Sequence, residues 1–160
     1  MKNTLASLTL SLFLILFVNS IYSCKKDHAT SSTDDMYDIS ASMTPAQETG
    51  TLNGSPTGSG TVSGTYDAKT NSLQYSVTWT GLTGTATGGH FHGPALAGAN
   101  AGVVIPFTLT NNGTSGSASG TVALTDAQEA DLLAGKWYAN IHTAANAGGE
   151  IRGQVSATHQ

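Results

Sequence analysis

The chain has 160 residues, with 6 lysines and arginines against 10 aspartates and glutamates, so its formal net charge is −4. This mild acidity, without a basic cluster, excludes the electrostatic footprint of a nucleic-acid-binding protein. Charged residues make up only 10% of the chain and 19 residues are glycine, a composition typical of an exported protein built from short strands. The length suits a single domain.

The first 23 residues are predicted to be a secretory signal peptide. Lys2 precedes an apolar run from Leu8 to Val18, which is shorter than the ~20 apolar residues that span a bilayer. Cys24, the only cysteine, follows Ile21-Tyr22-Ser23, and this arrangement resembles the lipobox at which bacterial signal peptidase II cleaves. We therefore expect Cys24 to carry lipid. The alternative is an ordinary secreted protein in which the cysteine is incidental.

Residues 24–35 are polar and without periodicity, which predicts a flexible tether after the lipidated cysteine. The residue after Cys24 is Lys25 and not the aspartate that commonly retains lipoproteins in the inner membrane. Lys25-Lys26-Asp27 also resembles the short charged stretch of surface-exposed lipoproteins in some Gram-negative bacteria. We therefore expect anchoring in the outer membrane, with its outer face as one option.

From residue 36 to the end at 160 the chain is predicted to form one domain, and its hydrophobic pattern has period two. The clearest case is residues 73–79, where Leu73, Tyr75, Val77 and Trp79 alternate with polar neighbours. This alternation is typical of a half-buried antiparallel strand. Residues 67–71 are expected to form a hairpin loop before it.

The segment His90-Phe91-His92 is also expected to lie on a strand. Alternation then puts both histidines on one face and Phe91 in the core. Residues 103–109 predict a further strand, with Pro106 marking an edge position or a bulge. Residues 116–124 predict the next one.

A single short helix is predicted over residues 126–134. Thr125-Asp126-Ala127-Gln128 matches a capping box, and Gly135 is suited to end the helix with a positive φ. About seven or eight strands are predicted besides this helix. The sequence therefore predicts an all-β fold, an antiparallel, Greek-key-like β-sandwich or barrel.

The last two predicted strands form a hairpin. Pairing Ile141 opposite Ile151 puts every apolar position of the hairpin on one face, and such a pattern fixes the register of a half-buried sheet. The polar pairs on the other face are His142 opposite Glu150 and Asn140 opposite Arg152. Cross-strand pairs of this kind favour a structural role for Glu150 and Arg152 over a catalytic one.

These segments resemble the CHRD domain, a module named after its repeats in chordin. The resemblance rests on three segments: His90-Phe91-His92-Gly93, Tyr138-Ala139-Asn140-Ile141-His142-Thr143 and Gly148-Gly149-Glu150-Ile151-Arg152-Gly153-Gln154. The family's opening segment resembles a fourth one, Met43-Thr44-Pro45-Ala46-Gln47-Glu48. It covers residues 36–157. The family has no established catalytic activity. The resemblance therefore implies an extracytoplasmic binding or structural module and no enzyme.

The principal hypothesis is accordingly a membrane-anchored binding or structural module whose partner is an unidentified extracellular protein or small ligand. The alternative is a single zinc or copper ion held by His90, His92 and His142, since two imidazoles on one strand and a third nearby form a three-ligand set. Glu150 could then orient the ring of His142. The arrangement is loosely similar to copper–zinc superoxide dismutases but lacks the other ligands of their two-metal site.

An enzyme that uses His142 with Glu150 or Arg152 is the least favoured hypothesis. No serine, cysteine or threonine is placed by the sequence as a partner nucleophile. No glycine-rich phosphate loop is present, so we expect no nucleotide cofactor.

Overall fold

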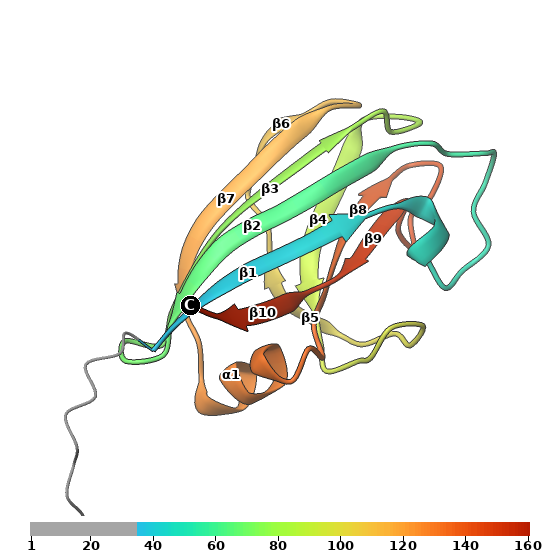
Figure 1. Cartoon of the computed structure of the whole chain (residues 1–160). Helices are drawn as coiled ribbons and strands as arrows, with labels where there is room; N and C mark the ends of the chain where they lie inside the picture. The colour runs from blue at the N-terminus through green and yellow to red at the C-terminus, as the bar shows by residue number, and fades with distance from the viewer. Residues whose placement is uncertain (1–34) are drawn as a thin grey trace, which may run out of the picture. The chain divides into compact units, whose positions relative to one another are not determined.

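The computed structural model describes residues 35–160. The predicted signal peptide, the lipidation site Cys24 and nearly all of the predicted tether lie outside these described residues. Residues 35–160 form two antiparallel sheets with one α-helix and one short 3₁₀ helix, which confirms the all-β sandwich (Figure 1). None of the helices in this part of the chain is long and apolar enough to cross a membrane.

The two sheets differ in size. The strands of the larger sheet are β1 (Met36–Met43), β2 (Ser59–Asp67), β3 (Ser72–Thr80), β6 (Leu109–Asn112), β7 (Gly116–Ala123) and β10 (Ser156–His159). The strands of the smaller sheet are β4 (Ala86–His92), β5 (Val103–Pro106), β8 (Tyr138–Thr143) and β9 (Ile151–Gln154). Their orders are β10-β1-β2-β3-β7-β6 and β5-β4-β8-β9. The helices are η1 (Pro45–Gln47) and α1 (Asp126–Leu133).

The core lies between the two sheets and is made by the alternating apolar positions. On β3 the predicted residues all face inward, and Tyr75 packs edge-on against Phe91 of β4 with ring centroids 5.2 Å apart. Phe91 is fully buried, and its ring lies 5.8 Å from that of Trp137, which is 1% exposed. The inward position of Phe91 requires its neighbours on β4 to point to the opposite face, as the period-two pattern predicts.

Helix α1 forms for the reason that the sequence indicates. The Thr125 hydroxyl accepts a hydrogen bond from the backbone N–H of Gln128, and the Gln128 side chain accepts one from the backbone N–H of Thr125. Gly135 has the expected positive φ, 66°. The helix ends at Leu133, one residue earlier than predicted.

The strand count and one predicted strand were wrong. The described residues contain ten strands instead of seven or eight. The predicted strand over residues 103–109 is two strands, β5 in the small sheet and β6 in the large one. The alternation continues through both because each sheet buries one face, so the pattern alone does not show where the chain changes sheets. Pro106 does lie on an edge strand.

The outer face of the large sheet carries hydroxyl side chains in rows. The register aligns one exposed serine from each of five neighbouring strands, namely Ser156, Ser40, Ser63, Ser76 and Ser119. In the next row the Thr61 and Thr78 hydroxyls are hydrogen-bonded at 3.0 Å. This face therefore presents many hydroxyl groups and few charged side chains, among them Asp38.

Candidate functional site

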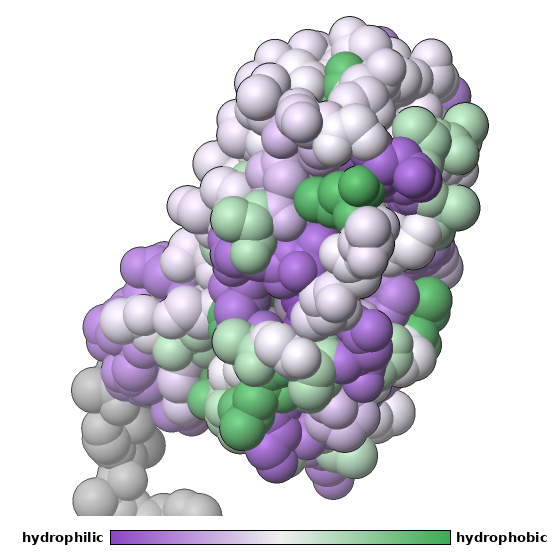
Figure 2. Space-filling view, turned by 90° about the vertical axis from the view of Figure 1, so that its right-hand side faces the viewer, coloured by the Kyte–Doolittle hydropathy of each residue, from purple (hydrophilic) through white to green (hydrophobic). Residues whose placement is uncertain are grey.

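The outer face of the small sheet has a different character, because its side chains are large, polar and partly covered by loops. These side chains come from β4, β8 and β9 and are His90, His92, Tyr138, Asn140, His142, Arg152 and Gln154. Figure 2 views the end of the molecule that carries η1 and the loop before β5, where hydrophilic residues gather around a hollow. All the site residues predicted within the domain lie on or beside this face, except that Glu150 points away from the histidines.

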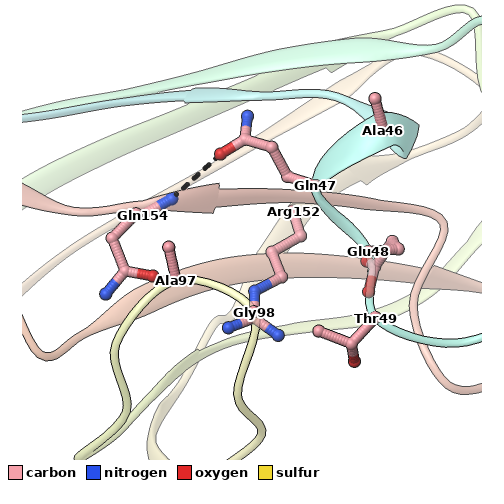
Figure 3. Close-up of a pocket in the computed structure, with 8 residues that line it drawn as sticks. All are labelled: Ala46, Gln47, Glu48, Thr49, Ala97, Gly98, Arg152 and Gln154. Atoms are coloured by element: carbon pink, nitrogen blue, oxygen red, sulfur yellow. Dashed lines mark hydrogen bonds between the residues drawn. The ribbon is translucent and has the colours of Figure 1, made fainter.

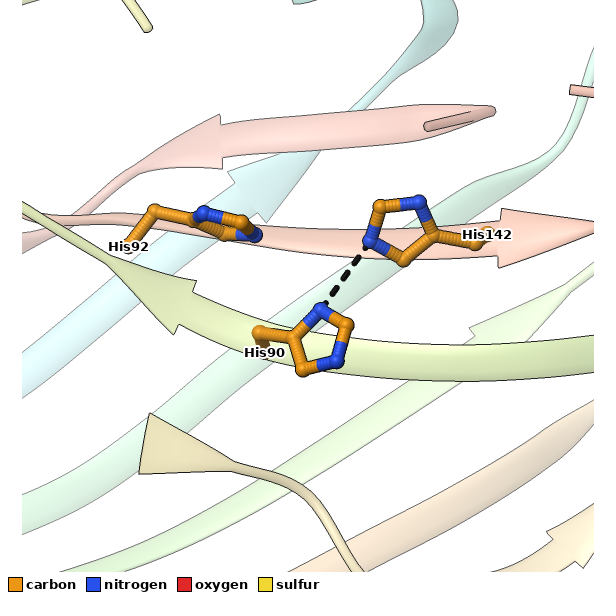
Figure 4. A group of neighbouring side chains, drawn as sticks. All are labelled: His90, His92 and His142. Atoms are coloured by element: carbon orange, nitrogen blue, oxygen red, sulfur yellow. Dashed lines mark hydrogen bonds between the residues drawn. The ribbon is translucent and has the colours of Figure 1, made fainter. Parts of the chain in front are cut away.

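The three histidines predicted to act together do lie together. His90 and His92 project from β4 and His142 from β8, and one ring nitrogen from each lies within 4.8 Å of the others (Figure 4). Nδ1 of His90 and Nε2 of His142 are 3.1 Å apart and form a hydrogen bond. All three side chains are half-buried.

The pKa of each imidazole in this cluster is lowered, which favours the neutral form. Burial lowers the pKa of His90, and the neighbouring His142 and His92 lower it further. Burial is also the main cause that lowers the pKa values of His92 and His142, although hydrogen bonds to backbone carbonyls partly oppose it. Neutral rings are the form that can accept a hydrogen bond or ligate a metal.

Arg152 is 2% exposed, and its guanidinium lies 3.4 Å from the centre of the Tyr138 ring. The opposing strand residue is Asn140, as predicted, but the two side chains have different hydrogen-bond partners. Nη1 donates to Asn100 Oδ1 at 2.9 Å and Nη2 donates to the carbonyl oxygen of Ala99 at 2.6 Å. These hydrogen bonds of Arg152 therefore hold the loop between β4 and β5 against the sheet. Among residues 35–160, Arg152 makes no ion pair with a carboxylate.

A surface pocket of about 340 Å³ opens between this loop and η1 (Figure 3). Its lining residues are Ala46, Gln47, Glu48, Thr49, Ala97, Gly98, Arg152 and Gln154. Gln154 closes one side by donating from Nε2 to the carbonyl oxygens of Ala95 and Gly135. The pocket is small and is bounded by the side chains that hold the loop.

Glu48 also contributes to this face, although the residue pattern of the hairpin does not predict it. Its Oε1 accepts a hydrogen bond of 2.6 Å from Asn140 Nδ2, across a separation of 92 residues. Burial raises the pKa of Glu48 from 4.5 to about 7, and the positive charge of Arg152 opposes that rise. Only the resemblance to the family's opening segment pointed to this residue, because no local pattern connects it to β8.

Replacement of Glu48 by glutamine is expected to reduce the pH dependence of stability between pH 5 and pH 8. Because the pKa of Glu48 is higher in the folded state, the folded protein binds more protons than the unfolded one between about pH 4.5 and pH 7, so stability falls as the pH rises through this window. The amide of Glu48→Gln keeps the oxygen that accepts from Asn140 and does not titrate. Urea unfolding at both pH values measures the effect, and an unchanged pH dependence in the variant would contradict it.

The predicted interaction of Glu150 with His142 was wrong. The Glu150 carboxylate is fully buried and accepts hydrogen bonds from the backbone and hydroxyl of Thr83, from the hydroxyl of Thr143 and from Nδ2 of Asn146. Burial raises the pKa of Glu150, but these hydrogen bonds outweigh it and the net shift is downward. Glu150 precedes β9 instead of belonging to it, so strand alternation does not apply to its side chain.

Two glycines of the segment from Gly148 to Gln154 leave no room for a side chain. Gly149 has a φ of 131°, and a Cβ there would collide with Asn140 Nδ2 and Glu48 Oε1. A Cβ on Gly153 would collide with the backbone of Ser42. The residue types from Gly149 to Gln154 are thus explained largely by the close packing of the hairpin and by its hydrogen bonds to the surrounding loops.

Comparison with known proteins identifies the family of this chain. The family model described as the CHRD domain matches residues 39–155, from β1 to the residue after β9. No curated protein and no solved structure gives a significant match. The matched range contains the histidine cluster, Glu48 and the whole of the closing motif. The chain therefore belongs to the CHRD domain family.

Proposed function

We propose that the protein is an exported lipoprotein that carries its CHRD domain outside the cytoplasm as a binding module and not as an enzyme. The apolar run from Leu8 to Val18 directly before Cys24 supports export and lipidation. Each methylene of an acyl chain buried in the bilayer contributes ~0.8 kcal/mol, so the two or three chains of a bacterial lipoprotein anchor it firmly. Lys25 after the cysteine favours the outer membrane.

The polar face of the small sheet supports binding over catalysis. Covalent hydrolysis needs a nucleophile activated by a neighbouring base. Within residues 35–160, the hydrogen bonds of the clustered histidines connect them to one another and to backbone carbonyls, and none connects them to a hydroxyl. The observation that carries the proposal is this half-buried imidazole cluster, which is arranged to accept a ligand and not to activate a side chain.

The membrane anchor is tested by replacing Cys24 with alanine. Cells grown with an alkyne-labelled fatty acid should label the wild-type protein and leave the Cys24→Ala variant unlabelled, since the thiol is the site of attachment. The wild type should fractionate with the outer membrane and the variant should not. A His28→Ala variant in the same segment should keep both properties. Labelling of Cys24→Ala, or an unlabelled wild type, would contradict the proposal.

The side of the membrane is tested with the same cells. Protease added to intact cells should degrade the domain if it lies on the outer face, and only permeabilised cells should allow degradation if it faces inward. Either result is compatible with the lipid anchor, so the two measurements answer separate questions.

A further inference from the structure

The hydrogen bonds of His92 and His142 define which nitrogen of each ring carries the proton. Nδ1 of His92 lies 3.1 Å from the carbonyl oxygen of Ala101, and Nδ1 of His142 lies 2.9 Å from that of Ala147. A carbonyl oxygen can only accept, so Nδ1 must be the donor in both neutral rings. Nε2 of each ring therefore carries the lone pair that can accept a hydrogen bond or bind a metal ion.

The two lone pairs are used differently. Nε2 of His142 accepts from Nδ1 of His90 at 3.1 Å. Nε2 of His92 is fully buried and has no hydrogen-bond partner in the described part of the chain. A buried acceptor without a partner is unfavourable, because it has lost its hydrogen bonds to water. The orientation of the His92 ring does not require an unpaired Nε2, because the hydrogen bond from Nδ1 to Ala101 already fixes it.

The positions of these nitrogens suit a metal ion. In a tetrahedral zinc site with bonds of about 2.0–2.1 Å to nitrogen, two ligand nitrogens lie about 3.3 Å apart. The 3.1 Å between Nδ1 of His90 and Nε2 of His142 is close to this value, and the three ligand atoms of the cluster all lie within 4.8 Å of one another. An ion would replace the proton between Nδ1 of His90 and Nε2 of His142, and His90 would then carry its proton on Nε2. Rotation of the side chains would bring the three ligand nitrogens closer together.

The surroundings of the cluster resemble those of known metal ligands. A histidine that binds a metal usually donates its other N–H to a carbonyl or carboxylate, which fixes the orientation of the ring. Ala101 and Ala147 provide these carbonyls, in place of the Glu150 carboxylate that the sequence suggested. The Tyr138 ring also stacks on His92, with centroids 4.8 Å apart and planes 3° from parallel.

The chemistry of the ligands restricts the ion. The cluster supplies three neutral imidazoles and no carboxylate, which suits zinc and copper and does not suit calcium or magnesium. We propose that Nδ1 of His90 and the Nε2 atoms of His92 and His142 bind one zinc or copper(II) ion, with a water molecule completing the coordination. This inference rests on the proposed function and names the ligand of the binding module.

The test uses the full-length lipoprotein, purified in detergent without an affinity tag and stripped with a chelator. Zinc and copper(II) salts are titrated separately against a chromophoric competitor, and bound metal is counted by mass spectrometry. We expect one ion per chain, and a decrease in affinity of more than about 100-fold in each of the variants His90→Ala, His92→Ala and His142→Ala. His159→Ala, an exposed histidine at the sheet edge, should bind as the wild type does.

Two further readouts separate loss of ligation from loss of folding. Copper(II) electron paramagnetic resonance should show nitrogen coupling from three imidazoles in the wild type and from two in a variant that retains weak binding. A bound ion should raise the unfolding midpoint of the wild type, by an amount that depends on its concentration, and leave a folded His92→Ala variant unchanged. An unloaded wild type at micromolar metal, or equal binding by the three variants and the wild type, would overturn the metal site. Neither result would affect the lipid labelling of Cys24.

Discussion

Replacement of Gly149 by alanine is expected to lower the free energy of unfolding by about 3 kcal/mol. A positive φ that L residues rarely adopt costs ~1–3 kcal/mol, and φ is 131° at this position. The new methyl group would also collide with Asn140 Nδ2 and Glu48 Oε1, and so break a hydrogen bond worth ~1 kcal/mol. Urea unfolding of the two proteins measures the difference.

The preceding residue provides the matched control. Gly148 is also a glycine of the β8–β9 loop, but a Cβ placed on it would meet no atom within 4 Å, and its φ is not in the left-handed region. Gly148→Ala should therefore change the free energy of unfolding by less than ~0.5 kcal/mol. If the two variants lose equal stability, close packing at Gly149 is not the reason that a glycine is present there.

Replacement of Glu150 by alanine is expected to cost about 3–5 kcal/mol of stability. The change removes a buried charge and leaves the backbone N–H of Thr83, the hydroxyl of Thr143 and the amide of Asn146 without their acceptor. Asp38→Ala, which removes an exposed carboxylate from β1, is the control and should cost far less. A small effect at Glu150 would mean that water replaces the carboxylate.

The same residue is expected to contribute to unfolding in acid. The pKa of Glu150 is lower in the folded state than its ordinary value of 4.5, so its contribution to stability is complete above pH 4.5 and is lost as the pH falls through the folded-state pKa. Glu150→Gln lacks this contribution at every pH. The wild-type and variant free energies of unfolding should therefore converge below pH 4.5, and parallel curves would contradict the assignment.

Much of the histidine cluster could be predicted because it depends on alternation alone. Period two places His90 and His92 on one face of β4 once Phe91 is assigned to the core. The apolar pattern of the hairpin fixes Ile141 opposite Ile151, as the structure shows, and so puts His142 on the same face. Each of these steps uses only the rule that one face of a sheet is buried.

The interactions of the charged residues could not be predicted in this way. Glu150 lies outside the regular ladder, and its partners Thr83 and Asn146 come from loops. The acceptor of Asn140 is Glu48, which is 92 residues distant, and those of Arg152 lie in the loop between β4 and β5. Strand periodicity carries no information on how loops fold back over a sheet, so the sequence supported only cross-strand charge pairing.

The serine row on the large sheet has a consequence for how the domain behaves in solution. Hydroxyls spaced at the ~4.8 Å distance between strands can each donate and accept hydrogen bonds with solvent, and they carry no charge. Hydrogen bonding of such neutral groups to water is not screened by salt, unlike the interactions of exposed charges. One side of the sandwich thus presents a hydroxyl-rich surface to solvent, and the opposite side carries the histidine cluster.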